Sequence, residues 1–271
     1  MLRTLRTIVP AMTLAVLAGF APADPAEAFD PISLPGTGDS TDILRSLAEK
    51  YSSQYPDRKV TVPNSIGSDG GIRVVGTGES PIGRVARLPN ADEKARWGDF
   101  TYLEFARVPV AFVVAPDSGV TNLTEQQICD VFSGRVTNWK QVGGNDLAIA
   151  VQSRPDGSNL QTIKKNIGCF ANLQWAPNAK FNERNPDLVA SMKTISGAVG
   201  FMPLSEAVLH GYRTVSLDGV APSTLQYKLG IGLGFVYKAA LPGAVQAFLD
   251  YLKTEPAHTI MRNTGHVPVT R

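Results

Sequence analysis

The residues best suited to binding chemistry lie in one short stretch, Ser153–Leu160. It follows an apolar run, Leu147–Val151, that is typical of a buried strand, and it precedes apolar residues at helical spacing. Ser158 is placed to cap that helix, whose first turn leaves backbone N–H groups unpaired and carries positive potential. An anion can accept those hydrogen bonds, and Arg154 adds a planar fork of donors. The alternative is that Arg154 only pairs with Asp156 and that Ser158 only caps.

Two more glycine-rich turns precede expected helices. Gly36–Thr41 leads into an amphipathic run, with Ser40 or Thr41 as its cap, and Ile66–Ile72 leads into a short expected helix after residue 72. The Gly36–Thr41 turn lacks the Gly-Lys-Ser/Thr of a Walker loop and the third glycine of a dinucleotide fingerprint. Plain turns and caps are the alternative. Three such turns together favour a site where helix N-termini converge on an anion.

Two arginines follow the third turn. Arg84 and Arg87 are either solvated surface charges or extra cations of the site, and their spacing alone favours the surface. The whole chain carries a net charge of only +2, without a basic block. Nothing in this distribution favours a nucleic-acid surface.

Residues 1–28 resemble a secretory signal. Arg3 and Arg6 supply the positive start, Ile8–Phe20 the short apolar core, and Ala26–Ala28 a small-x-small cleavage site. The apolar run is short and broken by Pro10, which disfavours a membrane anchor. We therefore expect a soluble exported protein.

Only two cysteines are present in the chain, Cys129 and Cys169. An oxidising compartment would favour a disulfide between them, closing a loop of about 40 residues, and two buried thiols are the alternative. The three histidines have no ligand-like spacing to each other or to the cysteines, so no metal site is expected.

The elements that must position these turns alternate between strand and helix. Val108–Ala115 is a continuous apolar strand, and Thr124–Gln127 is a capping box that opens a helix. Ala198–Met202 and Leu229–Tyr237 are further strands, and residues 245–252 form an amphipathic helix. This alternation predicts an α/β fold for a chain of 271 residues, long enough for one large or two medium domains.

Several segments, in order along the chain, resemble the phosphate-binding family of type II periplasmic binding proteins, the receptors of phosphate ABC importers. The strongest similarity is at Asn122–Trp139, which resembles the family's helix and its Phe-Ser/Thr-Gly-x-Ile-x-x-Trp segment. The other segments that carry the resemblance are Gly36–Thr41, Gly67–Gly71, Ser153–Ser158, Ser196–Phe201 and Gly265–Val269.

The resemblance implies a two-lobed type II fold, each lobe a mixed sheet flanked by helices, with the ligand in the cleft between lobes. Lobe 1 is then discontinuous, residues 29–112 plus 204–271, and lobe 2 covers 113–203, with crossovers near Phe112–Ala115 and Gly200–Pro203. Some members carry a cysteine where Cys129 lies and a later partner, which supports the pairing with Cys169.

Carried over residue by residue, the resemblance implies a set of anion ligands in three loops: Ser40, Thr41, Ser68, Arg154, Ser158 and Asn159. Three departures bear on the ligand. Ala86 stands where the family has an aspartate that accepts the proton of monohydrogen phosphate, and Asn159 and Leu160 replace a glycine and a threonine. Asp69 could replace the missing acceptor, and Arg84 or Arg87 could instead favour a fully ionised oxyanion or a carboxylate.

The expected function is an exported, periplasmic solute-binding protein that captures a small oxyanion, phosphate first, for the membrane subunits of an ABC importer. It is expected to be a monomer without cofactor or nucleic-acid partner. A non-transport anion sensor or accessory protein on the same scaffold, or a binder of a sulfate-like anion or a carboxylate, is the alternative. An enzyme is not expected, because no nucleophile elbow, metal cluster or Cys/His pair is visible.

Overall fold

A single long strand, β4 (Thr101–Val114), runs through the whole molecule. The computed structural model describes residues 31–154, 157–183 and 185–270. Successive side chains of a strand point to opposite faces. Accordingly Val110 and Phe112 lie in one buried cluster, while Ala111 and Val113 lie in another. The predicted strand 108–115 is therefore confirmed, and it begins seven residues earlier than its apolar run.

The main sheet has eight strands, and its central path runs β3-β11-β4-β8-β6-β7, with β9 and β12 also paired to β4. β4 pairs antiparallel with β11, β8, β9 and β12, whereas β6 is parallel to both β8 and β7. The remaining strands of this sheet are β3 (Gly83–Val85), β6 (Ala150–Ser153), β7 (Lys180–Phe181), β8 (Ala198–Pro203), β9 (Arg213–Thr214), β11 (Gly230–Tyr237) and β12 (Val267–Pro268). Two short parallel pairs lie outside it, β1 (Ile32–Ser33) with β2 (Val60–Thr61), and β5 (Asn122–Leu123) with β10 (Ser216–Leu217).

Helices cover the sheet on both sides. The α-helices are α1 (Thr41–Gln54), α2 (Gly67–Gly76), α3 (Ala91–Trp97), α4 (Glu125–Ser133), α5 (Ser158–Asn166), α6 (Asn185–Thr194), α7 (Leu204–His210), α8 (Gly243–Tyr251) and α9 (Glu255–Asn263). Short 3₁₀ turns are η1 (Pro116–Ser118), η2 (Trp139–Val142) and η3 (Gly168–Asn172). The predicted capping box is present: Thr124 accepts from the Gln127 N–H, and the Gln127 side chain accepts from the Thr124 N–H.

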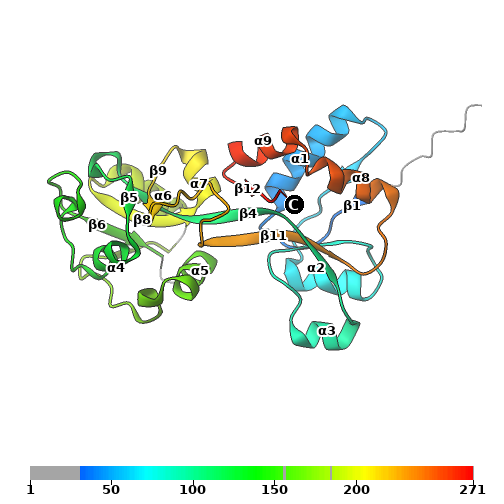
Figure 1. Ribbon diagram of the computed structural model, residues 1–271, viewed down its shortest axis with the longest axis horizontal. Helices are drawn as coiled ribbons and strands as arrows, with labels where there is room; N and C mark the ends of the chain where they lie inside the picture. The colour runs from blue at the N-terminus through cyan, green and yellow to red at the C-terminus, as the bar shows by residue number, and fades with distance from the viewer. Residues whose placement is uncertain (1–30, 155–156, 184, 271) are drawn as a thin grey trace, which may run out of the picture.

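The elements gather into two lobes joined by β4 and β11, which lie side by side between them (Figure 1). One lobe contains α1, α2, α3, α8 and α9, and the other contains α4, α5, α6 and α7 (Figure 1). Each lobe has its own apolar core, and β4 contributes Phe105 to one and Phe112 to the other. The expected two-lobed α/β fold is confirmed.

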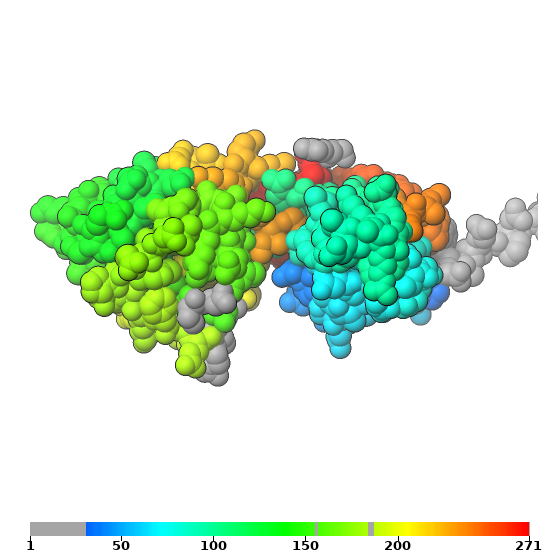
Figure 2. All heavy atoms as spheres, turned by 90° about the horizontal axis from the view of Figure 1, so that it is seen from below, coloured from blue at the N-terminus to red at the C-terminus, as the bar shows by residue number. Residues whose placement is uncertain are grey.

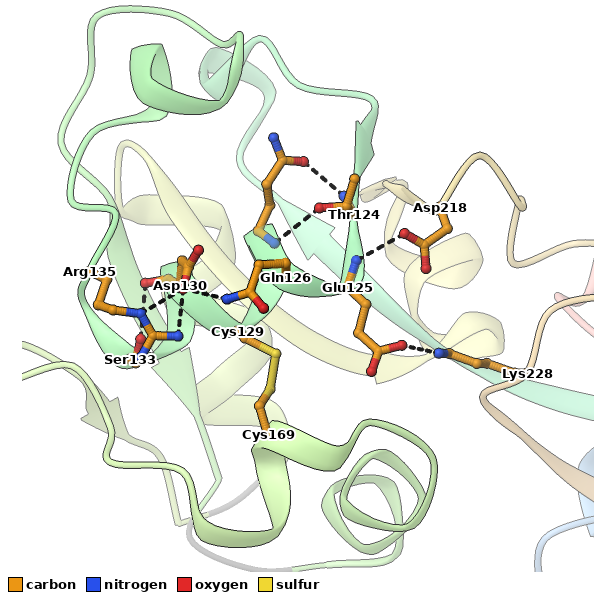
Figure 3. Close-up of a disulfide and its surroundings, with 11 residues drawn as sticks. Thr124, Glu125, Gln126, Cys129, Asp130, Ser133, Arg135, Cys169, Asp218 and Lys228 are labelled. Carbon is orange, nitrogen blue, oxygen red and sulfur yellow. Dashed lines mark hydrogen bonds and ion pairs between the residues drawn. A yellow bond between two sulfur atoms is a disulfide. The ribbon is translucent and has the colours of Figure 1, made fainter.

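Where one lobe ends and the other begins stays a prediction. Residues 204–229, expected in lobe 1, contribute Val215, Leu217, Tyr227 and Leu229 to the buried cluster that also contains Phe132 and Trp139. In the same segment Asp218 accepts a hydrogen bond from the Glu125 N–H at 3.1 Å, and Lys228 pairs with the Glu125 carboxylate (Figure 3). We propose that the second crossover lies at the start of β11, near Gly230, and that lobe 2 extends to about that residue.

The predicted disulfide joins Cys129 in α4 to Cys169 in η3, with the Cα atoms 6.1 Å apart (Figure 3). It fastens the end of the α5 segment to the core of the second lobe, where Phe132 and Phe170 also meet. The expected secretory signal, residues 1–28, lies outside the described residues. Among the residues that are described, no helix is both long and apolar enough to cross a lipid bilayer.

Removal of this disulfide should destabilise the fold. The bond spans 40 residues, for which the chain-entropy model gives about 4 kcal/mol. We expect Cys129→Ala with Cys169→Ala to lower the free energy of unfolding by about 2–4 kcal/mol, measured by urea unfolding under non-reducing conditions. Reducing agent should destabilise the wild type and leave the double variant unaffected. Equal stability of the two proteins would contradict the stabilising role.

Acid should destabilise the fold through His266. Burial lowers the pKa of His266 to about 4. The unfolded chain therefore takes up a proton near the usual pKa of about 6.5, before the folded protein does, so stability is full above that pH and is lost down to about pH 4. The loss is at most about 3 kcal/mol.

The measurement is urea unfolding at about pH 7.5 and about pH 4.5 for the wild type and His266→Gln. We expect a smaller loss in the variant than in the wild type. His210→Gln, which alters a partly exposed histidine, is the control and should keep the wild-type loss. The same acid loss in all three proteins would contradict the assignment.

Candidate functional site

The first anion loop is held by a backbone bridge to β3. Arg84 N–H donates to Pro35 O at 2.7 Å and Thr37 N–H donates to Arg84 O at 3.1 Å. Gly36 lies between them at φ +140°, where a Cβ would stand 2.1 Å from Arg84 O. Glycine is needed here both for its positive φ and for this close approach. The bridge fixes the direction in which the loop enters α1.

Helix α1 begins as predicted, with Ser40 as its N-cap and Thr41 as its first residue. The Ser40 side chain makes no capping bond; it is fully buried, and its Oγ has no hydrogen-bond partner among the described residues. Thr41 Oγ1 accepts a hydrogen bond of 2.8 Å from Arg84 Nη1. Ser40 therefore keeps its hydrogen-bonding capacity at a helix N-terminus, where an anion is favoured.

Arg84 is fully buried, so the surface position that its spacing favoured is wrong. Besides Thr41, its guanidinium donates to Leu34 O through Nε at 2.5 Å and to Pro63 O through Nη2 at 2.8 Å. Desolvation by burial, with a smaller contribution from the charge of Arg45, lowers the pKa of Arg84 to about 10, so it is cationic at neutral pH. Its partners come from distant segments, which spacing in the sequence could not reveal.

The second loop is itself helical. α2 begins at Gly67, six residues before the position that the sequence pattern suggested, so Ser68 and Asp69 lie in its first turn. Ser68 Oγ accepts from the Ala86 N–H at 3.0 Å, which ties α2 to the end of β3. The aspartate expected at the Ala86 position is absent, and the backbone of Ala86 meets Ser68 instead.

Arg87 is held by two carboxylates. Glu93 receives two of its N–H groups at 2.7 and 2.8 Å, and Asp69 receives a third hydrogen bond. The hydrogen bonds to Glu93 are the main reason that the pKa of Arg87 is raised, and the same bonds lower the pKa of Glu93. Both residues expected as possible additions to the site, Asp69 and Arg87, are therefore engaged with each other.

The third loop follows β6 in the other lobe. Arg154 donates through Nη2 to Glu183 O at 3.1 Å. Gly157, at φ +135°, is the N-cap of α5, one position before the predicted cap, so Ser158 is instead the first helical residue. Asn159 lies in the first turn. Asp156, the alternative partner considered for Arg154, lies outside the described residues.

Loops from the two lobes line one groove. A pocket of about 240 Å³ between the lobes contains Asp39 from the first loop, residues of the third loop, and Val108 and Ile231 from the connecting strands. From below, a groove separates the two lobes, with part of the orange β11 segment visible between them (Figure 2). Its remaining lining residues are Arg154, Gly157, Ser158, Asn159, Leu160, Phe201, Pro203 and Ser205.

A second, more open pocket lies on the first lobe alone. Asp39 lines it as well, together with residues of the first and second loops: Thr37, Gly38, Ser65, Gly67, Ser68, Asp69 and Arg87. Asp39 is therefore common to the interlobe pocket and to the pocket between the first and second loops. The structure thus brings Arg154, Ser158 and Asn159 together with Asp39 of the first loop, while Ser40 and Thr41 follow Asp39 in the chain and line neither of these two pockets.

Asp39 is the pocket residue that sequence reasoning missed. Its carboxylate accepts from Thr37 Oγ1 at 2.7 Å and is exposed in the groove. Its position inside the Gly36–Thr41 turn was the available signal, but an aspartate before a helix is more often a turn residue. A larger pocket of about 350 Å³ lies between β4 and α8 and receives none of the three loops, so the groove is the stronger candidate.

The arrangement is suited to binding an anion by hydrogen bonds. It offers helix N-termini, hydroxyl groups and a guanidinium. Within the described ranges no group of three or more His, Cys, Asp or Glu side chains could hold a metal ion.

Comparison with known proteins gives consistent results. Residues 21–256 match the family model described as PBP superfamily domain. The phosphate-binding protein PstS of Bacillus subtilis is 27% identical over 247 residues, covering 88% of this chain and 81% of that protein.

Two solved structures share the fold. A substrate-binding protein from Clostridium perfringens, crystallised with bound phosphate, is 27% identical with a TM-score of 0.62, over 89% of this chain and 100% of its own. An ABC-type phosphate transport receptor from Vibrio cholerae is 26% identical with a TM-score of 0.60, over 87% and 99% of the two chains.

Two neighbouring glycines of α2 test how tightly the loops are packed. A Cβ on Gly71 would lie 2.4 Å from Arg84 O, which is backbone, whereas a Cβ on Gly70 would meet only the side chain of Ile66. We expect Gly71→Ala to lower the free energy of unfolding by about 2 kcal/mol or more. Gly70→Ala, the matched control, should stay within about 1 kcal/mol, because helix propensity favours alanine and Ile66 is exposed. Equal effects in urea unfolding would contradict the close packing on Arg84.

Proposed function

The chain belongs to the PBP superfamily, and we propose that it captures a small oxyanion, phosphate first, for an ABC importer. The observation that carries this proposal is the interlobe pocket, in which the Arg154–Asn159 loop of one lobe meets the Gly36–Thr41 loop of the other. Its relatives of similar length in B. subtilis and V. cholerae are described as a phosphate-binding protein and as a phosphate transport receptor. Their identities of 26–27% support the same ligand class for this chain.

The proposed ligand set consists of residues from the three loops: Ser40, Thr41, Ser68, Arg154, Ser158 and Asn159. Arg154 supplies the charged fork, and the N-termini of α1 and α5 supply backbone donors from opposite sides of the groove. Charge-assisted hydrogen bonds contribute about 1.5–3 kcal/mol each. Several of them, less the cost of desolvating the anion, can give the roughly 8 kcal/mol of a micromolar binder.

A protonated phosphate also needs an acceptor. With Ala86 at the position of the family's aspartate, we propose Asp39 for this task rather than Asp69. Asp39 lines both pockets of the groove, whereas Asp69 is engaged with Arg87. Ligand binding would then draw the two lobes together by a hinge motion about β4 and β11.

The delivery role implies export, periplasmic location, a monomeric state and docking to the membrane subunits of the importer. Residues 1–28 support export through their signal-like pattern. We propose a binding protein rather than an enzyme, because the described groove presents hydrogen-bond donors without a paired nucleophile and base.

A different anion is the second candidate. Ala86 and Asn159 depart from the family pattern in the loops themselves. A sulfate-like anion has no proton to donate and would not need the missing aspartate. Calorimetric titration with phosphate, sulfate and small carboxylates distinguishes these ligands. Absence of binding to all of them would overturn the proposed capture of a small anion.

The decisive variant is Arg154→Ala. Loss of the charged fork should weaken phosphate binding by about 10–100-fold, measured by calorimetry. Arg135→Ala is the matched control in the same lobe, because Arg135 forms an exposed ion pair with Asp130 away from the groove. The control should stay within about twofold of the wild type. Unchanged binding by the Arg154 variant would refute the site.

A further inference from the structure

The feature that the proposed ligand set does not use is the guanidinium of Arg84. It is fully buried, and all its described partners are neutral oxygens: Leu34 O, Pro63 O and Thr41 Oγ1. None of the ion pairs found in the described part of the chain includes it. A buried charge without a counter-charge is costly in free energy. A guanidinium buried next to a proposed anion loop therefore points to a bound anion as its counter-charge.

The hydrogen bond to Thr41 connects this charge to the first residue of α1, two positions after the groove residue Asp39. Because Thr41 Oγ1 accepts from Arg84 Nη1 at 2.8 Å, its own O–H can only donate, and the acceptor that it has in the structure is Thr37 O, at a long 3.5 Å. A hydroxyl that accepts from a cation is polarised and donates more strongly. The neighbouring Ser40 Oγ is fully buried and has no partner within the described residues, which is a second, independent sign of a missing ligand at the start of α1.

We propose that Arg84 is a positioning residue for the anion, which fixes Thr41 as a donor and adds a buried positive charge, so that the groove takes an oxyanion in its dianionic form. This inference rests on the proposed function and adds to it the charge state of the bound ligand. The Coulomb energy of a charge pair scales with the ligand charge, and a dianion therefore gains twice what a monoanion gains from Arg84.

Other charged groups border the same loops. They are Arg45 of α1, Asp39 of the first loop, Asp69 of α2, and Arg87, which follows β3 and is paired with Glu93. Arg45 is the matched control for Arg84. It also donates to a loop carbonyl, Val62 O, but it is exposed to water, where its charge is screened.

The test is calorimetric titration of the protein with inorganic phosphate, with thermal unfolding as the folding check. Arg84→Met and Arg84→Lys both lose the planar fork and its bonds to Leu34 and Pro63, but only the methionine removes the charge. At about pH 8 we expect Arg84→Met to lose about tenfold or more in affinity. Arg84→Lys should bind at least about threefold more tightly than Arg84→Met, and Arg45→Met should stay within about twofold of the wild type. Equal affinities for the methionine and lysine variants would overturn the proposal.

Variants of Thr41 give a second test, which does not require the Arg84 variants to fold. Thr41→Ser keeps the hydroxyl and should retain affinity, whereas Thr41→Val should lose about tenfold. The valine change should matter less when Arg84 is already methionine, because the two act as a unit. Full affinity in Thr41→Val, or strict additivity of the two losses, would contradict the path from Arg84 through Thr41.

The charge state is tested on the wild type. Phosphate loses its second proton between about pH 5.5 and about pH 8. We expect about tenfold tighter binding at the higher pH, and equal or weaker binding there would overturn the dianion assignment. If the wild type binds neither phosphate nor sulfate, the proposed function itself fails. If it binds but Arg84→Met binds equally well, only the role of Arg84 fails.

Discussion

The backbone ladder of β4 sets the positions of everything else in the molecule. One edge of this strand pairs with β11 and then with β9, and the other edge pairs with β12 and then with β8. Phe105 and Phe112, seven residues apart on the same strand, enter the cores of different lobes. A register slip of one residue would move each side chain to the opposite face, so the ladder fixes how the lobes face each other. The anion loops meet across the groove because of that alignment.

The groove combines satisfied and unsatisfied polar groups in a particular way. Most buried polar atoms in proteins have partners. Here Arg84, Ser68 and Arg87 each bind a specific group, which makes the loops rigid, while the Ser40 hydroxyl at the start of α1 has no partner in the part of the chain that the structure describes. Rigid surroundings with open donors are the arrangement that lowers the cost of ordering a site on binding.

Much of this could be predicted from local sequence patterns. The capping box at Thr124, the strand around Val110 and the disulfide follow from short-range signals or from a resemblance to one family, and the structure confirms them. The start of α2 was placed too late, because a run of glycines and short polar residues is typical of a turn, whereas packing against β3 makes it helical.

The burial of Arg84 could not be predicted, since Leu34 and Pro63 are 50 and 21 residues away along the chain. The contacts of residues 204–229 with α4 are equally hidden from local patterns, as they join segments about a hundred residues apart. Local sequence patterns thus do not predict which distant residues the polar groups contact.

The sharing of β4 has a further consequence for modularity. Neither lobe contains a complete sheet of its own. Removal of either lobe would therefore leave the other with an exposed strand edge, which is a template for aggregation. A fragment carrying one half-site could not be excised and fused to another protein as an independent unit. Replacement of single loops on the intact scaffold is therefore the route by which such a protein can acquire a new ligand.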